Sequence, residues 1–177
     1  FGIDQGRRLE QVFEVFLDQK MCQPHITFLE LFQYTGIHLV VSATSLTNSC
    51  VEYFDYKRTP DMAVSHGLRI SASIPFMFTP VHYNQSMYVD GGVLCHLPVP
   101  CIDKFSLPNT RIITFSIQRN PVQTIDSFTE YIHALFECVN KKQEITKNEH
   151  RINIPVTSSG AHFEMSTKEK HDAIQCG

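Results

Sequence analysis

The spacing of apolar residues predicts where the chain forms helices. Between residues 4 and 20, apolar side chains recur three or four positions apart, which is the period of an amphipathic helix with one buried face. The apolar residues of this segment are Leu9, Val12, Phe13, Phe16 and Leu17. Thr27 and Glu30 then match a capping box, which predicts a short second helix that Gly36 can end in a left-handed conformation.

The periodicity then changes to that of strands. Residues 37–43 form a nearly continuous apolar and β-branched run, which predicts a strand buried on both faces, and the alternating residues 51–56 predict its neighbour. Thr59-Pro60-Asp61 combines a hydroxyl cap with proline at the first helical position, and predicts a helix that runs to about residue 71.

Strands and helices continue to alternate to the end of the chain. Further strands are predicted at residues 87–89, 111–117 and 152–155, and further helices at residues 127–142 and 166–174. This alternation predicts an α/β domain in which helices cover both faces of a mainly parallel sheet.

Composition and charge exclude several classes of protein. With 177 residues, 42% of them hydrophobic and 19% charged, the chain can bury a core and is neither collagen-like nor disordered. Fifteen Lys and Arg stand against 18 Asp and Glu without forming a basic stripe, so we expect no nucleic-acid partner. Neither a membrane-spanning apolar run nor the apolar part of a signal peptide is present, which favours a cytoplasmic location.

The strongest candidate for chemistry is Asp90, which follows a predicted strand and precedes Gly91 and Gly92. A carboxylate at a strand end, next to a freely turning backbone, suits a general base. The same tripeptide is also typical of a tight turn that an aspartate caps, and taken alone it favours the turn.

Several motifs around Asp90 occur together in one order. They are Thr27-Phe28-Leu29-Glu30-Leu31, Val41-Ser42-Ala43-Thr44, Ser73-Ile74-Pro75-Phe76 and Tyr88-Val89-Asp90-Gly91-Gly92. This order resembles the patatin-like phospholipases over almost the whole chain, and the pairing of the motif at Ser73 and Pro75 with Asp-Gly-Gly is its specific part.

The resemblance implies a three-layer α/β/α fold and a serine acyl hydrolase that uses a Ser-Asp dyad without cofactor or metal. Asp90 matches the aspartate of the dyad, and Gly91 and Gly92 complete its motif. Phospholipids or other acyl esters are the implied substrates, which is compatible with contact at a lipid surface. Phe76, Met77 and Phe78 could line an acyl-chain pocket, or they could fill the edge of the sheet as core.

Two features of the family pattern are absent from this sequence, namely the glycine-rich oxyanion loop and Gly-x-Ser-x-Gly. We therefore interpret residues 1–177 as a single partial domain, incomplete at its N-terminal side, with the nucleophilic serine upstream. The alternative is a catalytically inactive patatin-like module that binds lipid or a partner protein. A third hypothesis is metal-assisted hydrolysis by Asp90 with His82, Cys95 and His96, although the spacing of these residues is unlike that of most zinc sites.

Overall fold

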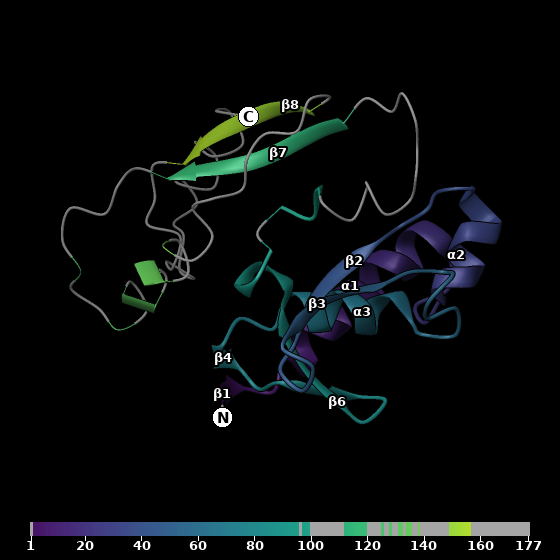
Figure 1. Cartoon of the computed structure of the whole chain (residues 1–177). Coiled ribbons are helices and arrows are strands. Elements are labelled where there is room, and N and C mark those ends of the chain that lie inside the picture. The colour runs from purple at the N-terminus through teal and green to yellow at the C-terminus, as the bar shows by residue number, and fades with distance from the viewer. Residues whose placement is uncertain are drawn as a thin grey trace. The chain divides into compact units, whose positions relative to one another are not determined.

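The computed structural model divides the chain into two compact units, Phe1–Pro98 and Val99–Gly177, which are described separately. The described residues are 2–95, 97–99, 112–119 and 149–156, with the single positions 125, 128, 131, 132, 134, 135 and 138. The first unit holds three helices and six strands within this described part (Figure 1). None of the described helices is long and apolar enough to cross a membrane.

The first predicted helix is present as α1 (Arg7–Met21). It begins after Gly6, which adopts a left-handed conformation with φ 68°, and it ends at Cys22. Its predicted buried face is only partly covered, because Leu17 packs against the core whereas Val12 and Phe16 are 46% and 60% exposed. The apolar period therefore predicted the helix correctly and its burial incompletely.

The second helix, α2 (Phe28–Thr35), has the predicted capping box. The backbone N–H of Glu30 donates to Oγ1 of Thr27 at 3.2 Å, and Oε2 of Glu30 accepts from the backbone N–H of Thr27 at 2.8 Å. The hydrogen bonds from the backbone and side chain of Thr27 lower the pKa of Glu30. Gly36 ends the helix with φ 69°, as predicted.

The third helix, α3 (Val64–Ser71), ends where it was predicted to end but begins five residues later than Thr59. The residues before it form a turn instead. Thr59 accepts a hydrogen bond from the backbone N–H of Asp55 at 3.2 Å through Oγ1, so its hydroxyl closes this turn and caps no helix. A hydroxyl can bond either way, and here the preceding strand offers the partner.

The largest sheet of the first unit has the strand order β3-β2-β6-β5 and is antiparallel throughout. Its strands are β2 (Val41–Ser45), β3 (Cys50–Phe54), β5 (Val81–Tyr83) and β6 (Ser86–Asp90). Asn84 and Gln85 join β5 to β6 with positive φ angles of 45° and 65°, the conformation of a tight hairpin. A connection this short can join only antiparallel strands.

Parallel pairing occurs in two smaller sheets. In the first unit β1 (Gly2–Asp4) pairs with β4 (Phe76–Phe78), and in the second unit β7 (Ile112–Arg119) pairs with β8 (Glu149–Val156). Helices and strands with parallel pairs confirm the predicted α/β class. The parallel pairing lies in these two sheets. In the four-stranded sheet, short turns join β2 to β3 and β5 to β6, and β2 also pairs antiparallel with β6, which is distant along the chain.

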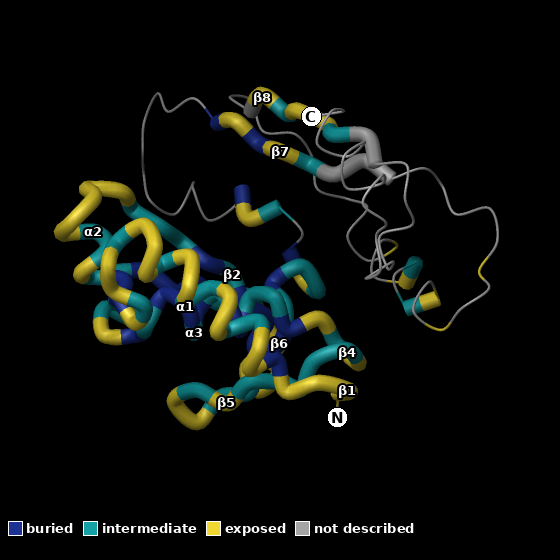
Figure 2. Tube along the Cα trace, turned by 180° about the vertical axis from the view of Figure 1, so that it is seen from behind, coloured by how far each residue is buried: buried dark blue, intermediate teal, exposed yellow. Residues whose placement is uncertain are grey.

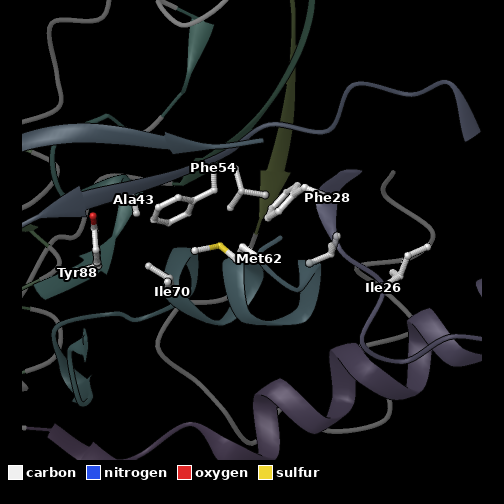
Figure 3. Packing of buried hydrophobic residues seen from close by; sticks show 9 residues of the cluster. Ile26, Phe28, Ala43, Phe54, Met62, Ile70 and Tyr88 are labelled. Carbon is white, nitrogen blue, oxygen red and sulfur yellow. The ribbon is translucent and has the colours of Figure 1, made fainter. Parts of the chain in front are cut away.

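The core of the first unit lies between its helices and one face of the four-stranded sheet (Figure 3). Its members come from three helical or turn segments and three strands: Ile26, Phe28, Val41, Ala43, Phe54, Met62, Val64, Ile70 and Tyr88. Phe28 is 2% exposed, and a Cβ on Gly67 would come within 2.8 Å of its ring. Glycine at position 67 therefore allows α3 to approach Phe28 closely.

The second unit is described mainly through β7 and β8, where the predicted strands at 111–117 and 152–155 are found. Strand β7 alternates between buried Ile112 and Thr114 and exposed Ile113 and Phe115, so it is buried on one face only. Single positions from 128 to 138 are helical, within the helix predicted at 127–142. The helix predicted at 166–174 lies outside the described residues.

A buried carboxylate holds the turn that precedes α3. Oδ1 of Asp55 accepts the backbone N–H groups of Lys57 and Arg58, each at 2.8 Å, and Oδ2 accepts from the Arg58 guanidinium and lies 3.4 Å from Nε2 of His38. Burial by itself raises the pKa of Asp55, but these hydrogen bonds and the charge of Arg58 outweigh it and lower the pKa below its usual 3.8.

Replacing this carboxylate tests the turn. The pKa of Asp55 is lower in the folded chain than in the unfolded one. The contribution of Asp55 to the free energy of unfolding is therefore complete above pH 3.8, the unfolded-state pKa, and is lost as the pH falls through the folded-state pKa. Asp55→Asn should lower the free energy of unfolding by about 1–3 kcal/mol at neutral pH. Urea unfolding should show this difference shrinking in acid, whereas the exposed control Asp61→Asn should change little at any pH.

Candidate active site

Asp90 is the last residue of β6, and its backbone is held from two sides. It pairs with Ala43 of β2 on one side, and its N–H donates to the carbonyl oxygen of Ser73 at 3.0 Å on the other. Strand β5 pairs with β6 only as far as Val81 opposite Tyr88, so the segment after α3 replaces it beside Asp90. The segment that follows α3 therefore fixes the position of Asp90 within the sheet.

The Asp90 carboxylate caps the turn that follows it. Oδ1 accepts the N–H of Gly92 at 2.7 Å, at the start of a single 3-10 turn, Gly91–Val93. The capped turn that the tripeptide favours is therefore present. It does not exclude a chemical role, because the same hydrogen bond fixes the orientation of a half-buried carboxylate at a strand end.

Gly91 is required for the close packing of this turn on β2. It is buried, and a Cβ at this position would lie 2.5 Å from Oγ and 2.6 Å from the carbonyl oxygen of Ser42. Since one of these atoms belongs to the backbone of a central strand, it cannot move aside easily. Gly92 has a separate role as the hydrogen-bond donor to Asp90.

Ser73 is fully buried and serves as a structural link to Asp90. Its Oγ donates to the carbonyl oxygen of Arg69 at 2.9 Å and accepts a hydrogen bond from Nη1 of the same residue. Its own carbonyl receives the N–H of Asp90. Both hydrogen bonds of the Ser73 hydroxyl are therefore made with Arg69.

Arg69 is the residue of this site that the sequence patterns did not single out. It is 2% exposed, and its Nη2 donates to the carbonyl oxygens of Gln5 at 2.8 Å and Thr79 at 3.4 Å. Its guanidinium lies 5.0 Å from the ring centre of Phe78 and packs tightly against Gly6. Burial lowers the pKa of Arg69, while the charges of Glu10 and Asp4 oppose this effect. One signal was available, namely a lone cation four residues before the Ser73 motif on an apolar helix.

The segment after Pro75 forms β4 rather than an open loop. Phe76 is 51% exposed with φ 69°, an uncommon conformation for a residue with a side chain, whereas Met77 and Phe78 are half-buried. The segment pairs with β1, and the ring of Phe78 lies against the guanidinium of Arg69. Of the three apolar candidates, Phe76 has the most exposed side chain.

The residues of the metal hypothesis are not gathered in the described part of the chain. His82 is exposed on β5 and pairs with Met87, which is three residues before Asp90 in β6. Sγ of Cys95 donates to the carbonyl oxygen of Leu97 at 3.2 Å. His96 lies outside the described residues. Among those that are described, no three His, Cys, Asp or Glu side chains are grouped to hold a metal ion.

Comparison with models of known protein families shows which family this chain belongs to. The model of the family described as "Patatin-like phospholipase" matches residues 1–100, which include the whole site around Asp90. The chain belongs to the patatin-like phospholipase family. This confirms the family that the order of motifs indicated.

Two relatives and one solved structure are similar to this patatin-like chain. A probable lipid hydrolase of Invertebrate iridescent virus 6 is 35% identical over 104 residues, which are 59% of the chain and 36% of the relative. An uncharacterized protein of Acanthamoeba polyphaga mimivirus is 27% identical over 191 residues, covering 100% of the chain and 63% of the relative. The chain thus spans less than two thirds of the length of either relative.

The crystal structure of VipD from Legionella pneumophila resembles the fold, with a TM-score of 0.56 and 13% identity. The match covers 87% of this chain and 34% of VipD. At this identity the likeness concerns the fold, and it supports the α/β patatin-like architecture.

Substitution of Gly91 should disturb the turn more than an ordinary glycine replacement does. Gly91→Ala forces a Cβ against Ser42, and we expect the free energy of unfolding to fall by about 1–3 kcal/mol. Gly36→Ala is the matched control, since no atom lies within 4 Å of its added Cβ and only its positive φ opposes alanine, by about 1 kcal/mol. Equal losses in urea unfolding would contradict a steric requirement at Gly91.

Replacing Arg69 tests the buried link between the N-terminal segment and Ser73. Arg69→Met keeps much of the side-chain volume but leaves Ser73, Gln5 and Thr79 without their donor, so we expect a loss of about 2–4 kcal/mol in the free energy of unfolding. The exposed arginine variant Arg8→Met should stay within about 0.5 kcal/mol of the unsubstituted chain. An equally small effect at Arg69 would show that its hydrogen bonds are not needed for stability.

Proposed function

We propose that this chain carries the general base of a lipid acyl hydrolase, and that Asp90 is that base. The observation that supports the proposal is the position of Asp90 at the end of β6, with its carboxylate oriented by Gly92, inside the region that matches the patatin-like family. The name of one relative, a probable lipid hydrolase, favours phospholipids or other acyl esters as substrates. No cofactor is needed for this chemistry.

In the proposed reaction the Asp90 carboxylate accepts the hydroxyl proton of a nucleophilic serine as that oxygen attacks the ester carbonyl. The electron pair of the carbonyl moves to its oxygen, which backbone N–H groups stabilise. The intermediate collapses to an acyl-serine, and the alcohol leaves with the proton that Asp90 returns. Water then attacks the acyl-serine as Asp90 takes one of its protons; the bond to the serine oxygen breaks, Asp90 returns the proton to that oxygen, and the fatty acid is released.

We infer that the serine belongs to a segment outside these 177 residues. None of the thirteen serines in the sequence stands in Gly-x-Ser-x-Gly, the pattern that exposes a nucleophile on a strand-to-helix turn. Ser73, the serine that contacts the backbone of Asp90, is buried with its hydroxyl engaged by Arg69. The greater length of both relatives is compatible with such a segment.

The alternative function is a lipid- or protein-binding module without hydrolytic activity. The absence of Gly-x-Ser-x-Gly is the observation that favours it. A fluorophosphonate probe, which reacts with activated serines, separates the two: the 177-residue chain should not be labelled under either proposal, whereas the full-length protein should be labelled only if it is an enzyme. Labelling of a serine within these 177 residues would contradict our placement of the nucleophile.

Asp90→Asn tests the base directly in the full-length protein. An amide cannot take the serine proton, so the rate of hydrolysis of a short-chain p-nitrophenyl ester should fall by about 10³-fold or more. Circular dichroism should show the fold retained, because the amide oxygen can still accept from Gly92. The matched control Asp61→Asn alters an exposed aspartate and should keep full activity. A change of only a few-fold in Asp90→Asn would remove Asp90 from the mechanism.

A further inference from the structure

Helix α1 carries four rows of side chains, each with one residue every four positions. The row that includes Leu17 and Met21 is apolar and packs against the core. The next row is acidic and consists of Glu10, Glu14 and Asp18. Histidines from outside the helix hold two of these acids: Nδ1 of His66 lies 2.9 Å from Glu10, and Nδ1 of His25 lies 3.4 Å from Glu14.

The other two rows are exposed, and we call them the outer face of α1. One row is Arg8, Val12, Phe16 and Lys20, and the other is Arg7, Gln11, Val15 and Gln19. The side chains of Val12, Val15 and Phe16 are 46%, 54% and 60% exposed, although each is apolar. Figure 2 shows α1 exposed along one side.

Acidic and basic side chains of α1 lie in different rows. The two rows of the outer face contain no acidic residue, and Arg7 and Arg8 stand at one end and Lys20 at the other, with the apolar side chains between them. All three acids of the helix lie in the neighbouring row. The chain as a whole has a net charge of −3, so this basic and apolar face is a local arrangement that runs against the average.

We propose that the outer face of α1 binds an anionic lipid surface. Val12, Val15 and Phe16 would enter the boundary between headgroups and acyl chains, while the long side chains of Arg8 and Lys20 reach lipid phosphates or carboxylates. Binding through this face requires no hydrolysis, so the inference goes beyond the proposed function and does not depend on the role of Asp90.

The charges at its ends argue against a second copy of this chain as the occupant. If two such faces packed antiparallel, Arg8 of one copy would meet Lys20 of the other, and if they packed parallel each cation would meet itself. Like charges at a close interface are unfavourable in both arrangements. A surface of anionic headgroups meets the same cations with opposite charge.

Co-sedimentation with vesicles tests the proposal on the full 177-residue chain. The chain should bind vesicles of phosphatidylcholine with about one third phosphatidylserine, should bind pure phosphatidylcholine much more weakly, and should be released by added salt. Phe16→Ser should weaken binding by about tenfold or more. Arg8→Gln and Lys20→Gln should each weaken it by about fivefold.

Two control variants change matched residues elsewhere. Leu46 is 48% exposed in the turn between β2 and β3, and Lys57 is an exposed cation beyond β3. Leu46→Ser and Lys57→Gln should leave vesicle binding unchanged, and circular dichroism should show every variant folded. If the controls weaken binding as much as the α1 variants do, the effect is not specific to this face and the proposal is wrong.

Other outcomes also overturn the proposal. Equal binding to both kinds of vesicle would exclude recognition of anionic lipid. If light scattering shows that the chain self-associates and that Phe16→Ser makes it monomeric without changing vesicle binding, the outer face of α1 is a protein interface. Loss of ester hydrolysis alone would concern Asp90 and leave the binding result standing.

Discussion

The buried guanidinium of Arg69 is the contact on which the arrangement around Asp90 depends. It bonds to Ser73 within its own helical end, to the carbonyl of Gln5 at the start of the chain and to Thr79 after β4. Gln5 is 64 positions from Arg69 in sequence, and a charged group without partners would be costly to bury. Because the carbonyl oxygen of Ser73 accepts the N–H of Asp90, a polar network and not apolar packing alone holds the site.

The sequence predicted those features whose interactions are local. The capping box of Thr27 and Glu30 joins residues three positions apart, so its pattern located α2 closely. The start of α3 was misplaced because Thr59-Pro60-Asp61 matches a helix start, whereas the Asp55 carboxylate takes the neighbouring N–H groups into a turn. Strand periodicity located β6, but β2 begins at Val41, four residues later than predicted, and Ile37 before it is exposed. Periodicity also could not show that β2 and β6 pair antiparallel, since pairing is decided by residues that are distant along the chain.

The candidate site divides in the same way. Asp90 could be found because a strand end, an aspartate and two glycines are adjacent in sequence, and the resemblance gave that tripeptide a meaning. Arg69 could not be given a role, because its partner Gln5 is 64 positions away and a lone arginine has no motif. The sequence also could not show why position 91 requires glycine. A Cβ there would collide with Ser42 of the neighbouring strand, and this contact, rather than the flexibility of Asp-Gly-Gly, is the reason.

The same network joins the site to the outer face of α1. Arg69 binds the carbonyl of Gln5, the residue before the Gly6 cap, so it fixes the point where α1 begins. A second contact, between Glu10 of α1 and His66 of α3, fixes the rotation of the helix; Glu10 and Glu14 are half-buried, whereas Asp18 is exposed. The face that remains outside is therefore held rigidly to the helix that ends near Ser73. A lipid surface bound there would meet the unit in one orientation, with the Asp90 segment at a set position relative to the lipid.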